Sequence, residues 1–181
     1  MSKPTRILVL GPSGAGKSTL AREIGARLGL PVVHLDALFW EPGWVESDET
    51  VFRARIAAAV ATDAWVIDGN YSRHLDMRLA RAHAVIWLDL PRSVYFPRAV
   101  WRSIKNYGRE RADVGLGNKE RFEIAFFKDF VWAYPTRSRA KQAAQMAGLP
   151  PTIARVVLRS RSEVAAFVRD LPGSLAHLSA R

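Results

Sequence analysis

The sequence predicts an α/β fold in which a five-stranded parallel sheet is covered by helices on both faces. Short apolar runs alternate with longer segments whose apolar residues recur at helical spacing, as is typical of strands joined by helical crossovers. A glycine-rich turn at residues 11–16 directly follows the first apolar run and precedes the first helical segment. Because parallel strands need long connections, this order favours a sheet buried on both sides.

The predicted strands are short apolar runs without strict alternation, as expected of buried parallel strands. They cover residues 6–10, 32–35, 65–68, 85–88 and 153–158. Helices are predicted where apolar side chains repeat every three or four positions, at residues 17–28, 51–60, 75–81 and 162–171.

The region between the fourth and fifth strands is expected to be largely helical, with interruptions around 108–117 and at Pro135. It holds an aromatic group that we assign to the core, because rings at such spacing usually pack inside. The members of this group are Phe122, Phe126, Phe127, Phe130 and Trp132.

Length and composition indicate one globular domain. The 181 residues suffice for a single core, and 49% of them are hydrophobic. No apolar run reaches the ~18 residues of a membrane span, and there is no cysteine. We therefore expect a cytoplasmic protein without a membrane span or disulfides.

The net charge of +10 is concentrated in one stretch. Residues 92–161 carry 15 Lys and Arg against 5 Asp and Glu, an excess of 15 − 5 = 10, whereas the rest of the chain is balanced. Such an excess calls for a polyanion, either a triphosphate or a nucleic-acid backbone, unless it is only a solvated basic face.

The glycine-rich turn matches the pattern G-x-x-x-x-G-K-[ST] at every fixed position. Small residues let successive backbone N–H groups converge on phosphates, and the following helix adds its positive end. Lys17 can then reach the β- and γ-phosphates, and the Ser18 hydroxyl can ligate Mg²⁺. The expected ATP-binding residues are Gly11, Pro12, Ser13, Gly14, Ala15, Gly16, Lys17, Ser18 and Thr19.

A P-loop is shared by several classes of protein, and two are disfavoured here. A GTPase should offer an Asn-Lys-x-Asp base reader, but Asn118 and Lys119 are followed by Glu120 and Arg121. The chain is also too short to add the helical domain of a ring ATPase. A small kinase is the class that remains favoured.

Three predicted strands end in an aspartate, namely Asp36, Asp68 and Asp89. Ligands of parallel sheets bind at the carboxyl ends of strands, so all three face the ligand side. We choose Asp68 to join Ser18 at the metal, with Asp89 as the alternative. Asp36 suits the phosphoryl acceptor, as a base or orienting group or a water-mediated metal partner, unless it only caps the next segment.

Several segments resemble the adenylate kinase family. Residues 65–73 (WVIDGNYSR) are similar to its apolar-Asp-Gly-x-x-x-Arg segment, and residues 97–102 (PRAVWR) to its lid-flanking Arg-x-x-x-Arg helix. A narrower resemblance, covering residues 6 to about 168, is to the related family of DNA topology modulation proteins. Its motifs lie at residues 34–44, 67–71, 88–92 and 135–139.

This resemblance implies a P-loop NTPase fold like that of nucleoside monophosphate kinases. It implies an ATP- and Mg-dependent phosphotransferase that moves the γ-phosphoryl group to a small nucleotide, nucleoside or metabolite. Residues 1–181 would form one domain, with an acceptor-binding insertion at 37–64 and a basic helical lid at 98–147. Arg98 and Arg102, one helical turn apart, would point at the phosphates and act with Lys17 and Asp36 in catalysis.

Aromatic residues near the acidic strand ends could stack on a base or line a sugar pocket, or could serve core and hinge packing. The expected substrate-binding residues are His34, Asp36, Phe39, Trp44, Tyr71 and Arg73. The alternative function is a DNA-associated P-loop ATPase affecting DNA topology. No helix-turn-helix, zinc-finger or RNA-binding motif supports DNA as a partner, so the sequence favours the kinase.

Overall fold

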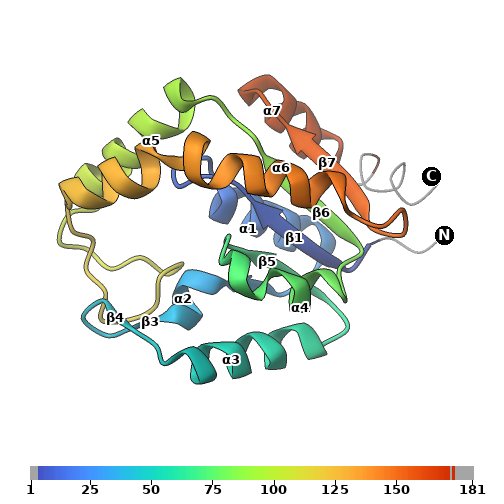
Figure 1. The fold of residues 1–181 in the computed structure, drawn as a ribbon, viewed down its shortest axis with the longest axis horizontal. Coiled ribbons are helices and arrows are strands. Elements are labelled where there is room, and N and C mark those ends of the chain that lie inside the picture. Colours follow the sequence, from blue (N-terminus) through green and yellow to red (C-terminus); the bar gives the residue numbers. More distant parts are fainter. Residues whose placement is uncertain (1–3, 172, 174–181) are drawn as a thin grey trace.

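A five-stranded sheet forms the centre of the computed structural model, which describes residues 4–171 and 173 (Figure 1). The strand order is β2-β5-β1-β6-β7, and all neighbours are parallel. The strands are β1 (Arg6–Leu10), β2 (Val32–His34), β5 (Trp65–Asp68), β6 (Ala84–Leu88) and β7 (Ala154–Leu158). This confirms the predicted parallel sheet of five strands.

Helices cover both faces of this sheet, as predicted (Figure 1). One face carries α1 (Lys17–Leu28), α5 (Arg92–Lys105) and α7 (Arg161–Arg169). The other carries α3 (Glu49–Ala61), α4 (Leu75–Leu79) and α6 (Ala140–Ala147). A short helical turn, η1 (Ser72–His74), leads into α4.

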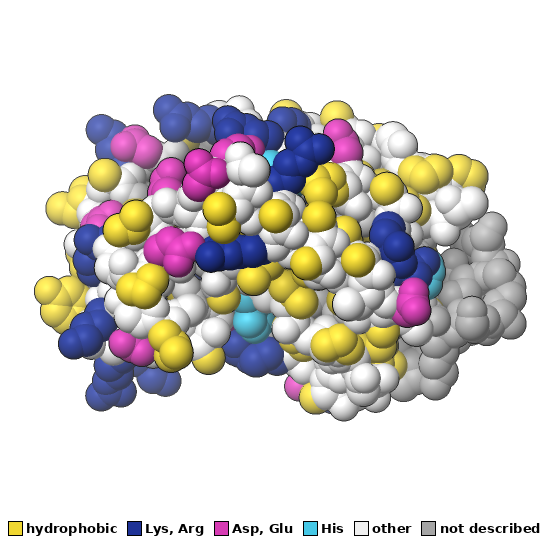
Figure 2. All heavy atoms as spheres, turned by 90° about the horizontal axis from the view of Figure 1, so that it is seen from below, with side chains coloured by type: hydrophobic (Ala, Val, Ile, Leu, Met, Phe, Trp, Pro, Cys, Tyr) yellow, Lys and Arg dark blue, Asp and Glu magenta, His cyan; other side chains and the backbone are white. Residues whose placement is uncertain are grey.

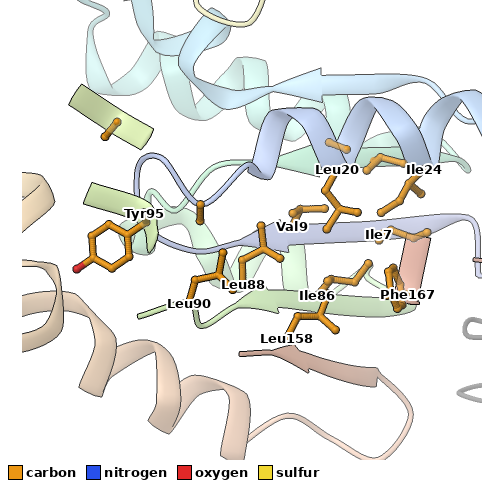
Figure 3. Packing of buried hydrophobic residues seen from close by; sticks show 14 of the residues in the cluster. Ile7, Val9, Leu20, Ile24, Ile86, Leu88, Leu90, Tyr95, Leu158 and Phe167 are labelled. Atoms are coloured by element: carbon orange, nitrogen blue, oxygen red, sulfur yellow. The ribbon is translucent and has the colours of Figure 1, made fainter. Parts of the chain in front are cut away.

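Alternation along β1 divides the core into two hydrophobic clusters. Ile7 and Val9 join the cluster under α1, α5 and α7, which Figure 3 shows, while Leu8 and Leu10 join the opposite cluster. All four side chains are buried. The central strand is therefore anchored from both sides, which holds the loop at its carboxyl end in place.

The segment after β2 contains elements that the sequence did not indicate. The chain turns directly into α2 (Leu35–Phe39) and then forms a small antiparallel hairpin of β3 (Trp40–Glu41) and β4 (Val45–Glu46). Strands of two residues show no measurable periodicity, so sequence patterns cannot reveal them.

The basic region is helical at both ends and irregular between. The predicted interruption around 108–117 is confirmed, and a short break at Ala133, between η2 and η3, agrees with the one predicted at Pro135. Wide π-helical turns, η2 (Phe126–Trp132) and η3 (Pro135–Arg139), lead almost continuously into α6. Pro135 opens its own helical turn, where the missing N–H is not required.

The aromatic group at residues 122–132 is assigned to the core by the sequence, and this assignment is wrong in part. Phe127 is buried, but Phe130 is 60% exposed, Trp132 49% and Phe122 44%. Only one side of this helical segment faces the sheet, so rings on its other sides reach solvent. Among the described residues, no helix has the length and apolarity needed to cross a membrane.

Candidate active site

The P-loop joins β1 to α1 and packs tightly against α5. Gly14 has a φ of +84°, and a Cβ there would lie 2.2 Å from the Tyr95 carbonyl oxygen. This close approach admits only glycine. Lys17 folds back over the loop, and its Nζ donates to the Pro12 carbonyl at 3.1 Å.

Ser18 at the start of α1 meets the end of β5. The Ser18 hydroxyl donates to Asp68 Oδ2 at 2.8 Å, because Asp68 lies beside Val9 in the sheet register. The other Asp68 oxygen accepts from His34 Nδ1, across the next strand pair. Burial opposes a charge on His34, but the Asp68 hydrogen bond and charge outweigh it and raise the His34 pKa.

Asp89, the alternative metal residue, has other partners. Arg139 holds it through two hydrogen bonds of 2.7 and 2.8 Å, and Arg159 Nε lies 4.0 Å away. The structure therefore brings Asp68, and not Asp89, to Ser18.

Asp36 is the first acidic residue of α2 and faces the same space as Lys17. The Tyr71 hydroxyl donates to its Oδ1 at 2.7 Å. Surrounding protein atoms desolvate the carboxylate and raise the Asp36 pKa, against the opposing effects of Tyr71 and Lys17, although the residue still opens to solvent. Burial lowers the Lys17 pKa, and the charges of Asp36 and Asp68 oppose that change. Lys17, Asp36 and Asp68 thus form one electrostatic unit.

Aromatic rings form a wall beside Asp36. The Phe39 ring lies 5.0 Å from that of Tyr71 and 5.0 Å from that of Phe52. Tyr71 itself takes a left-handed backbone conformation, with φ at +31°. Such strain in a residue other than glycine is often found at functional sites, and here it turns the hydroxyl toward Asp36.

Arg78 is a site residue that the sequence did not reveal. It is fully buried and donates to three successive carbonyls, those of Gly69 (2.8 Å), Asn70 (2.5 Å) and Tyr71 (2.9 Å). Burial lowers its pKa to about 10. A single arginine in a helical segment looks like a surface residue, so no sequence signal separates it from the others.

Asn70 links this segment to the P-loop. Its side chain accepts from the Gly11 N–H at 3.0 Å and donates to the Gly11 carbonyl at 2.9 Å. Together with Arg78, it fixes the loop after β5 against the phosphate-binding loop.

Two of the three arginines of α5, Arg98 and Arg102, face the P-loop. Arg102 Nη2 donates to the Ser13 hydroxyl at 3.2 Å. Arg98 lies beside Gly16, because its Nη2 would be 3.5 Å from the Cβ of a residue that replaced this glycine. Arg98 also borders a cavity of about 370 Å³ beyond the P-loop, whose walls include Gly16, Thr19, Leu20, Leu90 and Arg161.

The irregular segment after α5 adds Arg111, which belongs to the basic stretch that the sequence pointed to, and Asp113, which the sequence did not single out. Arg111 pairs with Asp113 and Glu120, each at 2.7 Å. Burial opposes the Asp113 charge, but the hydrogen bonds and charge of Arg111 lower the Asp113 pKa to about 2, and the charge of Arg111 also acts on Lys17. This segment therefore reaches down to the P-loop.

Trp44 and Arg73 are not brought to this group. The Trp44 N–H and indole Nε1 donate to Asn118 Oδ1 and to the Lys119 carbonyl, both at 2.7 Å. Arg73 has an 80% exposed side chain and pairs with Glu49 at 3.3 Å. Both residues lie at the rim of the site.

No cluster of three His, Cys, Asp or Glu side chains suited to a metal occurs among the residues that the structure describes. Ser18 Oγ and Asp68 Oδ2 nevertheless offer two adjacent oxygens beside the P-loop. Hard oxygen donors of this kind, completed by phosphate and water, fit Mg²⁺.

Comparison with known proteins places this geometry in a familiar fold. Residues 7–89 match the model of the ATPase family associated with various cellular activities (AAA). A gluconokinase from Sinorhizobium meliloti 1021 superimposes with a TM-score of 0.58 at 18% identity, covering 99% of this chain and 96% of its own. A shikimate kinase from Acinetobacter baumannii, in complex with shikimate, gives 0.60 at 14% identity, covering 98% and 96%. The chain has the P-loop NTPase fold.

Curated proteins also match this chain in sequence. The shikimate kinase of Halorhodospira halophila (strain DSM 244 / SL1) is 41% identical over 113 residues, or 52% of this chain. The match spans 62% of that relative's length. The predicted α/β P-loop fold is thus confirmed.

Proposed function

We propose that this chain is an ATP- and Mg²⁺-dependent phosphotransferase that moves the γ-phosphoryl group to a hydroxyl of a small metabolite. The observation that carries the proposal is the meeting of Lys17, Ser18, Asp36 and Asp68 at the carboxyl ends of β1, β2 and β5. The similarity to proteins named shikimate kinase and gluconokinase supports a metabolite as the acceptor.

The phosphate end of the site is built from backbone and cations. The P-loop N–H groups and the start of α1 would surround the phosphates, and Lys17 would exchange the Pro12 carbonyl for phosphate oxygens. Arg102 beside Ser13 and Arg98 beside Gly16 would stabilise charge that develops during transfer. The cavity of about 370 Å³ beyond Gly16 and Thr19 would take the nucleoside.

Ser18 and Asp68 would hold the metal ion, Ser18 directly and Asp68 directly or through water. Mg²⁺ bound there would supply positive charge that offsets the charge of the phosphates. His34, hydrogen-bonded to Asp68, would orient that carboxylate.

Asp36 would serve the acceptor. It would take the proton of the acceptor hydroxyl as its oxygen bonds to the γ-phosphorus, while the bond from that phosphorus to the leaving oxygen of ADP breaks. Tyr71 would hold Asp36 in place, and Phe39 would line the acceptor space. Trp44 and Arg73 would contact only the outer end of an acceptor.

Two segments would close around the bound substrates. Residues 37–64 would carry the acceptor-binding insertion, and residues 98–147 the basic lid. Within the lid, Arg111, whose charge acts on Lys17, would be the cation that approaches bound phosphates, and Asp113 would hold its guanidinium in place.

The test is ADP release from ATP in the presence of a panel of hydroxylated acceptors, including shikimate, gluconate and nucleosides. We expect at least one acceptor to raise turnover over water alone and to be recovered as its phosphate ester. Lys17→Ala should abolish this turnover with the fold intact, whereas Arg53→Ala, on the exposed side of α3, should not. Full turnover in a folded Lys17→Ala protein would contradict the proposal.

A second candidate is a DNA-associated P-loop ATPase, as the resemblance to DNA topology modulation proteins implies. One observation favours it. In the view of Figure 2, basic side chains are more numerous away from the termini than beside them, with acidic side chains among them, and the exposed rings of Phe130 and Trp132 belong to the basic stretch of the sequence, residues 92–161. Aromatic rings among cations suit single-stranded nucleic acid.

A further inference from the structure

A second cavity lies on the other side of Leu90 from the proposed nucleoside cavity. Its volume is about 430 Å³, and Leu90 borders both spaces. Its polar walls come from distant parts of the chain, namely Asp89, Arg92, Tyr95, Arg139 and Arg159. The two motif segments at residues 88–92 and 135–139 meet here, and the proposed kinase chemistry uses neither.

Two buried groups in this cavity, the Tyr95 hydroxyl and Arg92 Nε, form no hydrogen bond of normal geometry among the described residues, although the Arg92 guanidinium lies beside the Tyr95 hydroxyl. Tyr95 as a whole is only 1% exposed. Figure 3 shows its hydroxyl pointing away from the aliphatic cluster to which its ring belongs. Buried polar groups are nearly always paired in proteins, so an unpaired hydroxyl lining a cavity indicates a missing acceptor.

The charge around these donors is positive. Three arginines and one aspartate line the cavity, and Asp89 is already engaged by both oxygens with Arg139. Arg92 is held over the Trp132 ring, with its Cζ 4.1 Å from the ring centroid. Arg159 is 67% exposed and only 4.0 Å from Asp89. Arg92 and Arg159 therefore remain available to a bound anion.

We propose that this cavity is a second anion-binding site, separate from the P-loop, for a small phosphate or carboxylate compound. Tyr95 would donate its hydroxyl hydrogen to the anion, and Arg92 and Arg159 would balance its charge. Leu90, Pro91 and Pro135 would contact a short apolar body.

A ligand in this site would act on the P-loop through α5. The Tyr95 carbonyl lies against Gly14, and the next turns of the same helix carry Arg98 and Arg102. Fixing Arg92 and Tyr95 would therefore fix the helix that supports the phosphate-binding loop. The site is therefore suited to bind a metabolic anion that acts as an effector of the P-loop.

Thermal shift of the full-length protein tests the site, with inorganic phosphate and succinate titrated separately at constant ionic strength. Tyr95→Phe and Arg159→Gln should each raise the half-saturating concentration of one of these anions about tenfold, the effect of one charge-assisted hydrogen bond. Lys17→Ala should leave that concentration unchanged, because the P-loop is not involved. Arg53→Gln removes the same charge elsewhere and is the matched control.

The two anions distinguish a phosphate site from a carboxylate site, and a response to either supports the proposal. If the Lys17→Ala protein no longer responds to the anion, the binding belongs to the P-loop and the proposal is wrong. An unchanged response in both Tyr95→Phe and Arg159→Gln would also overturn it. Should Tyr95→Phe fail to fold, the exposed Arg159 decides alone. None of these readouts depends on kinase activity.

Discussion

At the scale of residues, Asp68 and Asp89 both follow apolar strand residues, but they have different hydrogen-bond partners. Asp68 accepts from Ser18 and His34, whereas Asp89 is paired with Arg139. The sheet order explains the difference. Asp68 ends β5, the neighbour of β1 on the β2 side, and Asp89 follows β6 on the other side, below η3.

We expect Asp68→Asn to weaken Mg²⁺-dependent ATP binding more than Asp89→Asn does, because only Asp68 adjoins Ser18. Asp89→Asn should instead lower the free energy of unfolding, by less than the ~3–5 kcal/mol of a fully buried pair since Arg139 is half exposed. Calorimetric ATP titration with and without Mg²⁺, together with urea unfolding, measures both effects. The reverse order of the two variants in metal dependence would mean that β6 supplies the metal residue.

Asp36 should set the acid limb of the pH profile. A base must be ionised, and desolvation raises the Asp36 pKa, so kcat/KM should fall at a pH above the usual 3.8 for this group. Tyr71→Phe removes a hydrogen bond that lowers this pKa and should move the limb to higher pH. Asp36→Asn should lose about 10²–10⁴ in turnover. A limb that Tyr71→Phe leaves in place would assign it to another group.

At the scale of elements, the β3–β4 hairpin and the irregular lid segment are fastened together. Gly43 N–H donates to the Gly117 carbonyl at 3.1 Å, and Trp44 N–H to Asn118 Oδ1 at 2.7 Å. Asn118 is only 1% exposed. The proposed acceptor insertion and lid therefore share one set of hydrogen bonds and should open and close together.

Asn118→Ala should break this connection, since it removes a buried acceptor worth about 1–3 kcal/mol. We expect faster amide hydrogen exchange in residues 40–47 and 108–119, and a higher KM for the acceptor, with little change in ATP affinity. Unchanged exchange in the hairpin of Asn118→Ala would show that the two elements move independently.

At the scale of the whole molecule, the balanced half of the chain builds most of the sheet, namely β1, β2, β5 and β6, and the basic stretch supplies α5, the irregular lid segment, α6 and the edge strand β7 (Figure 1). A polyanion surface and a phosphate-closing lid would use these charges differently. Contacts to a nucleic-acid backbone release counterions and weaken steeply with salt, whereas a closed site depends on salt far less.

Replacing both Arg98 and Arg102 by Ala separates these uses. If they stabilise the transferring group, turnover should fall by roughly 10³ or more, and ATP affinity should change much less. DNA affinity of the same protein, measured between low and high salt, supplies the comparison. Unchanged turnover with lost DNA affinity and a shallower salt slope would instead favour the DNA-associated ATPase.

The sequence by itself determined the parallel sheet, the P-loop and its flanking helix. These depend on local patterns, namely apolar runs, helical periodicity and a glycine spacing that only one loop conformation uses. The same patterns placed Lys17, Ser18 and Asp68 correctly at strand and helix ends. They did not decide between Asp68 and Asp89, because the residues of one strand do not determine which strands become its neighbours in the sheet.

Only the tertiary structure decided the remaining features. Arg78 and Tyr95 look ordinary in the sequence. Arg78 is defined by its burial against the carbonyls of residues 69–71, onto which the chain folds back, and Tyr95 by a cavity wall shared with residues far along the chain, such as Arg139 and Arg159. The exposure of Phe130 and the hairpin–lid connection likewise depend on which faces meet. Burial and hydrogen-bond partners are properties of packed neighbours, and those neighbours exist only once the chain has folded.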